Sequence, residues 1–206
     1  RAKAYAGEVI GVLEGVALAP EPEIPGIPEE AIGDTALIDL VHRVQLHYSG
    51  ADVSAAALFS NDSNIEPGPI CRRDASRVYR YTNTLYTVQM TGAQLRTFME
   101  WSVAIYQQYQ PGMLTIGFDP ETPNYNYDMF EGVSYAVDIS REPGERICDL
   151  TKPDGMPVAD DDVFAVVTNN FRANSHLLVP GVMFDEHDMP QLLESDIGGH
   201  IGGIRE

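Results

Sequence analysis

Twenty-one consecutive residues, Tyr81–Trp101, restrict the fold of this 206-residue chain more than any other segment. Residues 85–91 alternate apolar and polar side chains, the period-two pattern of a half-buried strand. Thr91 and Gln94 then have the spacing of a capping box, in which each side chain accepts the backbone N–H of the other residue. Apolar side chains recur afterwards at the period of an amphipathic helix. We therefore predict a strand that passes directly into a helix, with the loop 81–83 exposed at the strand end, where a ligand can bind.

Helix and strand patterns continue on both sides of that segment. An apolar stripe between Asp34, a suitable N-cap, and Ser49-Gly50, a suitable stop, predicts a helix. Residues 109–127 carry several prolines and glycines and are expected to be irregular. Further strands are predicted at 52–59, 78–81, 133–139, 146–150 and 163–168. Because helices come early and strands late without regular alternation, we predict an α+β fold on a mixed β-sheet with flanking helices.

The first 33 residues differ in composition from the rest. Prolines stand at positions 20, 22, 25 and 28, and proline fixes φ and removes a hydrogen-bond donor, which disfavours both helix and sheet. Two interpretations are open: a connector from an upstream domain, or an extended arm packed on the domain surface. We therefore divide the chain into residues 1–33, a linker or extended arm, and residues 34–206, the globular domain.

The chain has a formal net charge of −18, from 31 acidic and 13 basic side chains. Polynucleotide binding depends on neutralising phosphates with lysine and arginine, so no nucleic-acid partner is expected. A single arginine or a helix N-terminus can still hold a small anion. No apolar run approaches the ~20 residues of a membrane-spanning helix. The two cysteines, Cys71 and Cys148, fit either a disulfide or two free thiols.

Residue patterns for catalysis or metal binding are missing from the sequence. A two-metal phosphoesterase needs clustered Asp, His and Asn ligands, whereas the five histidines are scattered, at positions 42, 47, 176, 187 and 200. There is no phosphate-binding P-loop and no G-x-S-x-G motif. The run Asp160–Asp162 is typical of a solvated turn. We therefore expect no catalytic residue, metal or cofactor in this chain.

Aromatic side chains beside amides give a better basis for function. Tyr81 and Phe171 each stand near the end of a predicted strand, with Asn83 after the first and Asn170 before the second. Two aromatic rings can stack on the flat base of a nucleoside, and an amide can donate and accept hydrogen bonds at its edge. The alternative is structural, with Tyr81 as a core or rim aromatic and Asn83 as a turn former.

Five motifs, in the same order, carry a resemblance to a known family. They are ALIDLVHRVQLHYSGADVSAAALFS (36–60), YTNTLYTVQMTGAQLRTFMEW (81–101), NYNYDMFEGVSYAVDIS (124–140), GERICDL (144–150) and TNNFRAN (168–174). The chain resembles the 5'-nucleotidase C-terminal domain family. It is most similar to the branch that forms the C-terminal half of 2',3'-cyclic-nucleotide 2'-phosphodiesterase/3'-nucleotidases.

The resemblance implies a substrate-recognition domain of a larger phosphoric ester hydrolase. In this family an N-terminal metallophosphatase domain supplies two divalent metal ions and the catalysis, and the C-terminal domain binds the nucleotide by base stacking. Carried over to this sequence, Tyr81 and Phe171 stack on the base and Asn83 reads its edge. The expected partners are a nucleotide or nucleoside and the metallophosphatase domain. The expected location is extracellular, periplasmic or cell-wall associated in a bacterium, and the isolated chain is expected to be inactive.

Further residues complete the predicted site. Asp62 or Asn64 is expected to bond base or ribose, with turn formation as the alternative. Arg172 is expected to pair with phosphate or with a nearby acid, by default in a surface salt bridge. Gly132 is expected to let the backbone approach the ligand, unless its motif forms a small aromatic core. Relatives have a glycine-rich turn where residues 174–178 here are bulkier, which favours an alternative function: a non-catalytic interaction module that has lost nucleotide binding.

Overall fold

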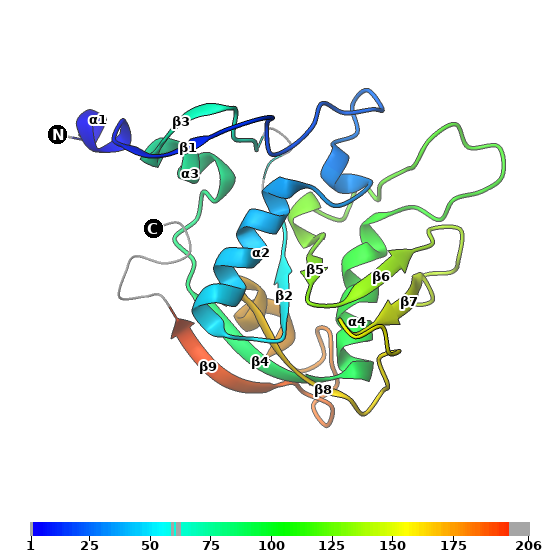
Figure 1. Cartoon of the computed structure of the whole chain (residues 1–206). Coiled ribbons are helices and arrows are strands. Elements are labelled where there is room, and N and C mark those ends of the chain that lie inside the picture. Colours follow the sequence, from blue (N-terminus) through cyan, green and yellow to red (C-terminus); the bar gives the residue numbers. More distant parts are fainter. Residues whose placement is uncertain (1, 59, 61–62, 198–206) are drawn as a thin grey trace.

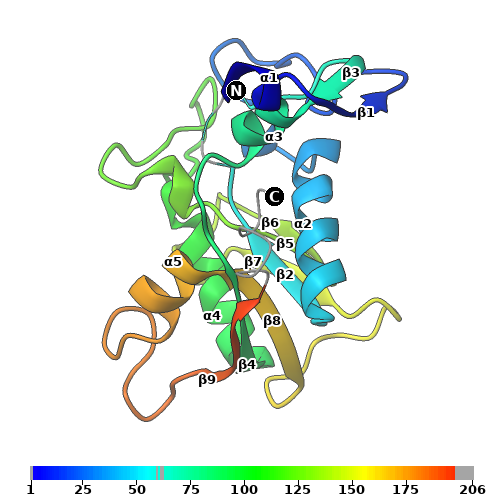
Figure 2. The same cartoon turned by 90° about the vertical axis from the view of Figure 1, so that its left-hand side faces the viewer.

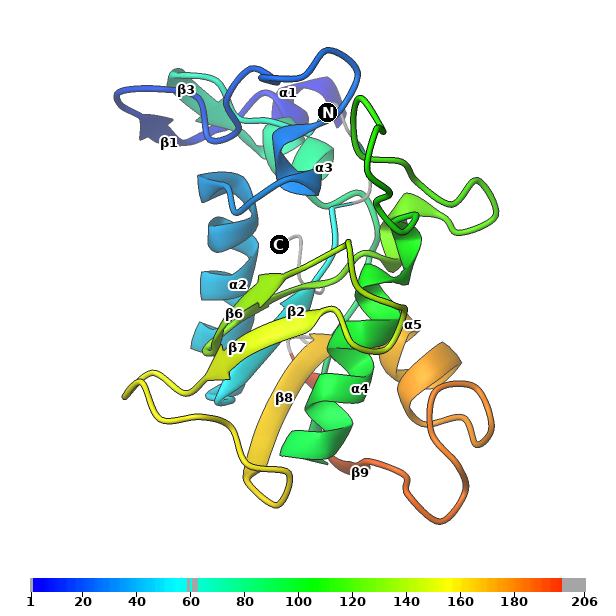
Figure 3. The same ribbon diagram turned by 90° about the vertical axis from the view of Figure 1, so that its right-hand side faces the viewer.

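A computed structural model of the protein describes residues 2–58, 60 and 63–197. Its centre is a five-stranded mixed sheet in the order β5-β2-β8-β4-β9, with helix α2 on one face and helix α4 on the other (Figures 1 and 3). The predicted α+β fold with a mixed sheet and flanking helices is therefore confirmed. The sheet and its covering helices are α2 (Ala36–Ser49), β2 (Val53–Ala56), β4 (Leu85–Thr91), α4 (Gly92–Ser102), β5 (Met129–Glu131), β8 (Val163–Asn169) and β9 (Gln191–Ile197).

The remaining elements surround this layered unit. A two-stranded ribbon of β6 and β7 lies beside α4, and a second ribbon of β1 and β3 lies with α1 and α3 at one end of the molecule (Figure 2). These elements are α1 (Ala2–Ala6), β1 (Val9–Leu13), β3 (Gly68–Cys71), α3 (Arg72–Val78), β6 (Ser134–Val137), β7 (Ile147–Thr151), α5 (Asn170–Arg172), 3-10 turns at Glu29–Ala31, Val103–Ile105 and Asn124–Asn126, and a π-helical turn at Ala173–Leu177.

Strand directions bring several chain segments to one edge of the sheet. β2 runs parallel to β8, whereas β5 pairs antiparallel with β2, and β4 antiparallel with both β8 and β9. β2, β8 and β9 therefore end at the same edge at which β4 and β5 begin. We call this the carboxyl edge. Leu85 pairs there with Asn169 on one side and with Ile197 on the other.

The strand-to-helix segment at 85–102 forms as the sequence predicts. The hydroxyl of Thr91 accepts a hydrogen bond from the backbone N–H of Gln94 at 3.1 Å, and the Gln94 side chain accepts one from the N–H of Thr91 at 2.9 Å. The cap satisfies N–H groups that the first helical turn leaves without a partner. Helix α4 ends at Ser102, one turn earlier than the apolar period suggests, because residues 103–105 continue as a 3-10 turn.

Two local expectations need correction, and some strands were not predicted. The N-cap of α2 is Thr35 rather than Asp34, although Gly50 ends the helix in the left-handed conformation as expected. Residues 78–81 do not form a strand, because Cys71 and Asp74 make a capping box that starts helix α3, which runs to Val78. Strands β1, β3, β5 and β9 were not predicted. The residues of β9 are exposed along nearly their whole length, and a strand with little buried area gives a weak periodic signal.

The first 33 residues lie against the domain along much of their described length. β1 pairs with β3, and Leu18 donates its N–H to the carbonyl oxygen of Ile65 at 3.1 Å. Ala19 and Ile27 are buried. The proline-dense stretch 20–28 itself contains no helix or strand. The described part of residues 1–33 is therefore held against the domain in several places, and its role as a connector stays a prediction.

Candidate functional site

The carboxyl edge brings together four of the residues that the sequence singled out. Tyr81 and Asn83 precede β4, and Asn170 and Phe171 follow its neighbour β8. The backbone N–H of Asn170 donates to the carbonyl oxygen of Thr84 at 2.9 Å. This bond extends the strand pairing by one step, so the two aromatic motifs are adjacent in space although they are far apart in the sequence.

Both predicted stacking rings are largely accessible. Tyr81 is 53% exposed and Phe171 is 48% exposed. The Phe171 ring is nearly perpendicular to the ring of Tyr125, with centroids 6.4 Å apart, and its centroid lies 6.0 Å from that of His176. Phe171 is thus supported by two neighbouring rings while half of its surface stays open to a ligand.

Two amides at this edge differ in how far they are satisfied. Asn83 donates through Nδ2 to the hydroxyl of the buried Tyr79 at 3.2 Å, which orients its side chain. The Oδ1 atom of Asn170 is buried and has no hydrogen-bond partner among the described residues. An unpaired buried acceptor costs roughly 1–3 kcal/mol, so a donor from a ligand or from water would be stabilised here.

Arg172 is buried, with its side chain only 3% exposed, and it does not reach the surface. Its Nε lies 2.7 Å from Oδ2 of Asp128, in ion-pair contact although not aligned as a hydrogen bond. Nη2 donates to the carbonyl oxygen of Tyr125 at 2.7 Å, and the guanidinium lies 4.5 Å from the ring centroid of Trp101. The nearby acid of the sequence prediction is therefore Asp128, and the pair is buried rather than at the surface. These contacts engage the guanidinium within the chain, and they hold the loop 125–128 against the start of α5.

Burial sets the protonation of the groups around Arg172. Complete burial raises the pKa of Asp128 to about 6, and the Arg172 guanidinium limits the rise. Burial, and then the charge of Arg172, lower the pKa of His176 to about 4. His176 is therefore neutral at pH 7, and it contacts the Trp101 ring at a centroid distance of 4.9 Å without adding charge beside Phe171.

The other predicted binding residues are placed differently from Tyr81 and Phe171. Asp62 lies outside the described residues. Asn64 uses both ends of its amide to hold the arm: Nδ2 donates to the carbonyl oxygen of Ala19 at 3.0 Å and Oδ1 accepts from its N–H at 2.8 Å. This corrects the expectation that Asn64 faces a base or ribose, since a side chain with a full set of partners has no donor or acceptor to spare.

The expectation that Gly132 lets the backbone approach a ligand is also corrected, because Gly132 lies at the other end of β5 from the carboxyl edge. Its φ is +97°, and a Cβ atom there would approach the carbonyl oxygen of Asp52 to 2.1 Å. Glycine is required by the close approach of the β2 backbone, not by a ligand.

The bulkier segment 174–178 does not cover the ring of Phe171. It forms most of the π-helical turn, with Leu177 fully buried and His176 placed between the rings of Trp101 and Phe171. Such turns often lie at functional sites because they redirect side chains. Here the turn puts an imidazole next to Phe171 and leaves that ring half exposed.

Sequence reasoning missed the residues that support the site. Tyr125 and Asp128 belong to a motif that the sequence singled out, but its pairing with Arg172 could not be read, because the two segments are far apart in the chain. The sequence pattern indicated for Trp101 only a position near the end of an amphipathic helix. The one available signal was the density of aromatics in residues 124–130, which is high for a loop.

The described part of the chain holds no group of three or more His, Cys, Asp or Glu side chains arranged to bind a metal ion. Cys71 and Cys148 are free thiols, which decides the question that the sequence left open. Among the helices that the structure describes, none has the length and apolar composition needed to cross a lipid bilayer.

A comparison with family models matches residues 9–181 to the 5'-nucleotidase C-terminal domain. This chain belongs to that family. The 2',3'-cyclic-nucleotide 2'-phosphodiesterase/3'-nucleotidase of Yersinia enterocolitica is 33% identical over 128 residues, which cover 54% of this chain and 19% of that protein. The trifunctional nucleotide phosphoesterase YfkN of Bacillus subtilis (strain 168) is 31% identical over 129 residues, which cover 54% of this chain and 8% of that protein.

Solved structures agree with the family assignment at the level of the fold. A Staphylococcus aureus protein assigned as a 5'-nucleotidase superposes with a TM-score of 0.70 at 22% identity, covering 83% of this chain and 32% of that one. Against the two curated relatives, this 5'-nucleotidase C-terminal domain spans a fifth of their length or less. Activities of those whole proteins therefore come to this chain only as proposals.

Proposed function

We propose that this chain is the substrate-recognition domain of a nucleotide phosphohydrolase and that it binds the nucleoside part of its substrate between Tyr81 and Phe171. The observation that carries the proposal is a pair of half-exposed rings in the segments that adjoin two paired strands: Tyr81 precedes β4, and Phe171 follows β8 directly after Asn170, whose Oδ1 has no partner among the described residues. Stacking on a base contributes about 1–3 kcal/mol per ring. An exocyclic amino group of a base is the kind of donor that Oδ1 lacks.

In this proposal catalysis is divided between two domains. An N-terminal metallophosphatase domain supplies two divalent metal ions and hydrolyses the phosphate ester, and the arm at 1–33 forms the connection to it. The parent enzyme is secreted and acts on 2',3'-cyclic nucleotides and 3'-nucleotides, or on 5'-nucleotides. The named activities of the relatives support this division.

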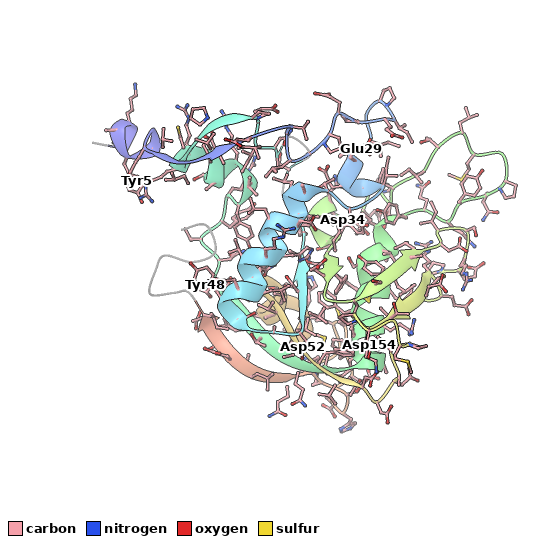
Figure 4. All side chains as sticks on the ribbon, in the orientation of Figure 1. Tyr5, Glu29, Asp34, Tyr48, Asp52 and Asp154 are labelled. Atoms are coloured by element: carbon pink, nitrogen blue, oxygen red, sulfur yellow. The ribbon has the colours of Figure 1, made fainter. Side chains whose placement is uncertain are left out.

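The proposal predicts that the chain binds nucleosides on its own. Titration with adenosine, uridine and 3'-AMP, followed by calorimetry and by NMR, is expected to give saturable binding. Removing one ring by Tyr81→Ala or Phe171→Ala is expected to weaken the affinity about tenfold or more, because 1.4 kcal/mol corresponds to a factor of ten. Tyr48→Ala is the matched control, since Tyr48 is 52% exposed but lies on α2 (Figure 4).

Three results would overturn the proposal. If no nucleoside or nucleotide binds, or if Tyr48→Ala weakens binding as much as the two site variants, the domain is an interaction module of another kind. Phosphate release by the purified chain in the presence of Mn²⁺, Zn²⁺ or Mg²⁺ would contradict the division of labour, because all catalysis is placed in the other domain.

A further inference from the structure

A cavity of about 560 Å³ lies between the end of the arm, helix α2 and the strands β5 and β6. Its volume is within the range of small-molecule sites. None of the residues proposed to bind the nucleoside lines it. Asp34 lies at the junction between the arm and α2 (Figure 4). The residues of this cavity that carry the following argument are Asp34, His42, Tyr106, Tyr127, Glu131 and Tyr135.

His42 lines this cavity, and one of its two ring nitrogens lacks a hydrogen-bond partner among the described residues. It is 2% exposed, and its Nδ1 lies 2.8 Å from the hydroxyl of Ser54. Its Nε2 is buried and has no hydrogen-bond partner among the described residues. Burial lowers the pKa of His42 to about 4, so the ring is neutral at pH 7. When Nδ1–H donates to Ser54, Nε2 presents a free lone pair, which can accept a hydrogen bond from a ligand.

The charges around the cavity are mainly negative. Asp34 and Glu131 are exposed side chains in its wall, and neither has an ion-pair partner within the described part of the chain. Partial burial and then the charge of Asp39 raise the pKa of both. Arg43 opposes the shift at Glu131. The carboxylates of Asp34, Asp39 and Glu131 therefore outnumber the guanidinium of Arg43 and the roughly half positive charge of the α2 N-terminus. The net charge around the cavity is negative, which disfavours an anionic ligand.

Tyrosine rings and apolar side chains line the rest of the cavity. The rings of Tyr106 and Tyr127 meet nearly at right angles, with centroids 5.4 Å apart. The hydroxyl of Tyr106 donates to the carbonyl oxygen of Ala31 at 2.7 Å, and the hydroxyl of Tyr135 accepts from the N–H of Phe130 at 3.2 Å, which fixes both rings in place. Aromatic faces attract cations through their quadrupole. The described residues show no cluster of ligands for a metal ion.

We propose that this cavity is a second binding site, which takes a small organic cation with a primary ammonium group. The ammonium bonds to Nε2 of His42, the carboxylates of Asp34 and Glu131 attract it, and the tyrosine rings cover its carbon skeleton. An ammonium has three donors and no acceptor, which matches a cavity that offers one free imidazole nitrogen and two unpaired carboxylates.

Benzylamine is a suitable probe, and benzyl alcohol is its neutral counterpart of nearly the same shape. In an NMR titration at pH 7, benzylamine is expected to shift the ring nitrogens of His42 and to fix the tautomer with hydrogen on Nδ1. Benzyl alcohol is expected to bind up to about fivefold more weakly, since an exposed charge pair contributes up to about 1 kcal/mol.

Variants separate this site from the general acidity of the surface and from the nucleoside site. Glu131→Gln is expected to weaken benzylamine binding about two- to fivefold. Glu145→Gln is the matched control, because Glu145 is exposed and does not line the cavity. Tyr81→Ala and Phe171→Ala are expected to leave benzylamine binding unchanged. The proposal is overturned if benzyl alcohol binds as tightly as benzylamine, if His42 does not respond, or if Glu145→Gln has the effect of Glu131→Gln.

Discussion

Arg172 connects three segments of the chain through a single side chain. It pairs with Asp128 before β5, donates to the carbonyl oxygen of Tyr125, and stacks over Trp101 near the end of α4. These contacts fix the position of the residue before it, Phe171. A buried charge pair contributes little net stability compared with apolar residues, but losing one partner leaves the other charge buried without compensation. Arg172 therefore acts on the proposed site as a positioning residue.

Asp128→Asn is expected to lower the free energy of unfolding by about 3 kcal/mol, because it leaves the buried Arg172 without its counter-ion. Urea denaturation followed by circular dichroism measures this loss. The double variant Asp128→Asn/Arg172→Met is expected to be more stable than Asp128→Asn alone, since it removes both charges.

Arg141→Met is the control for that measurement. Arg141 pairs with Asp138 at 3.1 Å, but both side chains are about half exposed, so its removal is expected to cost less than about 1 kcal/mol. A loss of similar size in Asp128→Asn and Arg141→Met would contradict the structural role given to the buried pair.

At the scale of elements, short-range rules account for those whose ends are set by neighbouring residues. The capping box of Thr91 and Gln94 starts α4, and Gly50 ends α2, as the sequence predicts. Residues 78–81 read as a strand because their side chains favour one, yet the capping box formed by Cys71 and Asp74 makes the preceding residues helical. Local propensity is weak where a neighbouring cap competes with it.

Gly132 shows how two elements fix one backbone position. Gly132→Ala is expected to lower the free energy of unfolding by roughly 3 kcal/mol, because an L-residue is strained at φ +97° and its Cβ meets the carbonyl oxygen of Asp52. Gly144→Ala is the matched control. Gly144 has a φ of +94° with open space around its Cβ position, so the change is expected to cost only about 1 kcal/mol. Thermal denaturation of both variants tests the difference, and equal losses would show that strain alone decides.

At the scale of the whole molecule, the arm is part of the folded unit although its prolines suggest a separate linker. Asn64 closes the contact through the backbone of Ala19, and the hydroxyl of Tyr106 bonds to Ala31. Backbone hydrogen bonds to distant side chains need no regular structure in the arm itself. A stretch without helix or strand can therefore be held in place along its length.

Asn64→Ala is expected to release the arm without unfolding the domain. Cleavage by a glutamate-specific protease after Glu23, which is exposed and not followed by proline, is expected to accelerate several-fold, and mass spectrometry of the fragments measures it. Asn174→Ala, a change of the same kind at another exposed asparagine, is expected to leave the cleavage rate unchanged. Unaltered cleavage in Asn64→Ala would show that other contacts hold the arm.

The sequence by itself determined the fold class, the strand-to-helix unit at 85–102 and the two aromatic motifs that meet at the carboxyl edge. These features depend on residues a few positions apart, whose periodicity and helix caps can be recognised within a short stretch of sequence. Only the tertiary structure decided that Arg172 is buried against Asp128 and that Asn64 holds the arm. It also decided that the backbone next to β2 leaves no room for a side chain at Gly132, and that His42 lines a second cavity. Each of these depends on contacts between segments far apart in the chain, which the three-dimensional packing of the layers brings together and no local pattern encodes.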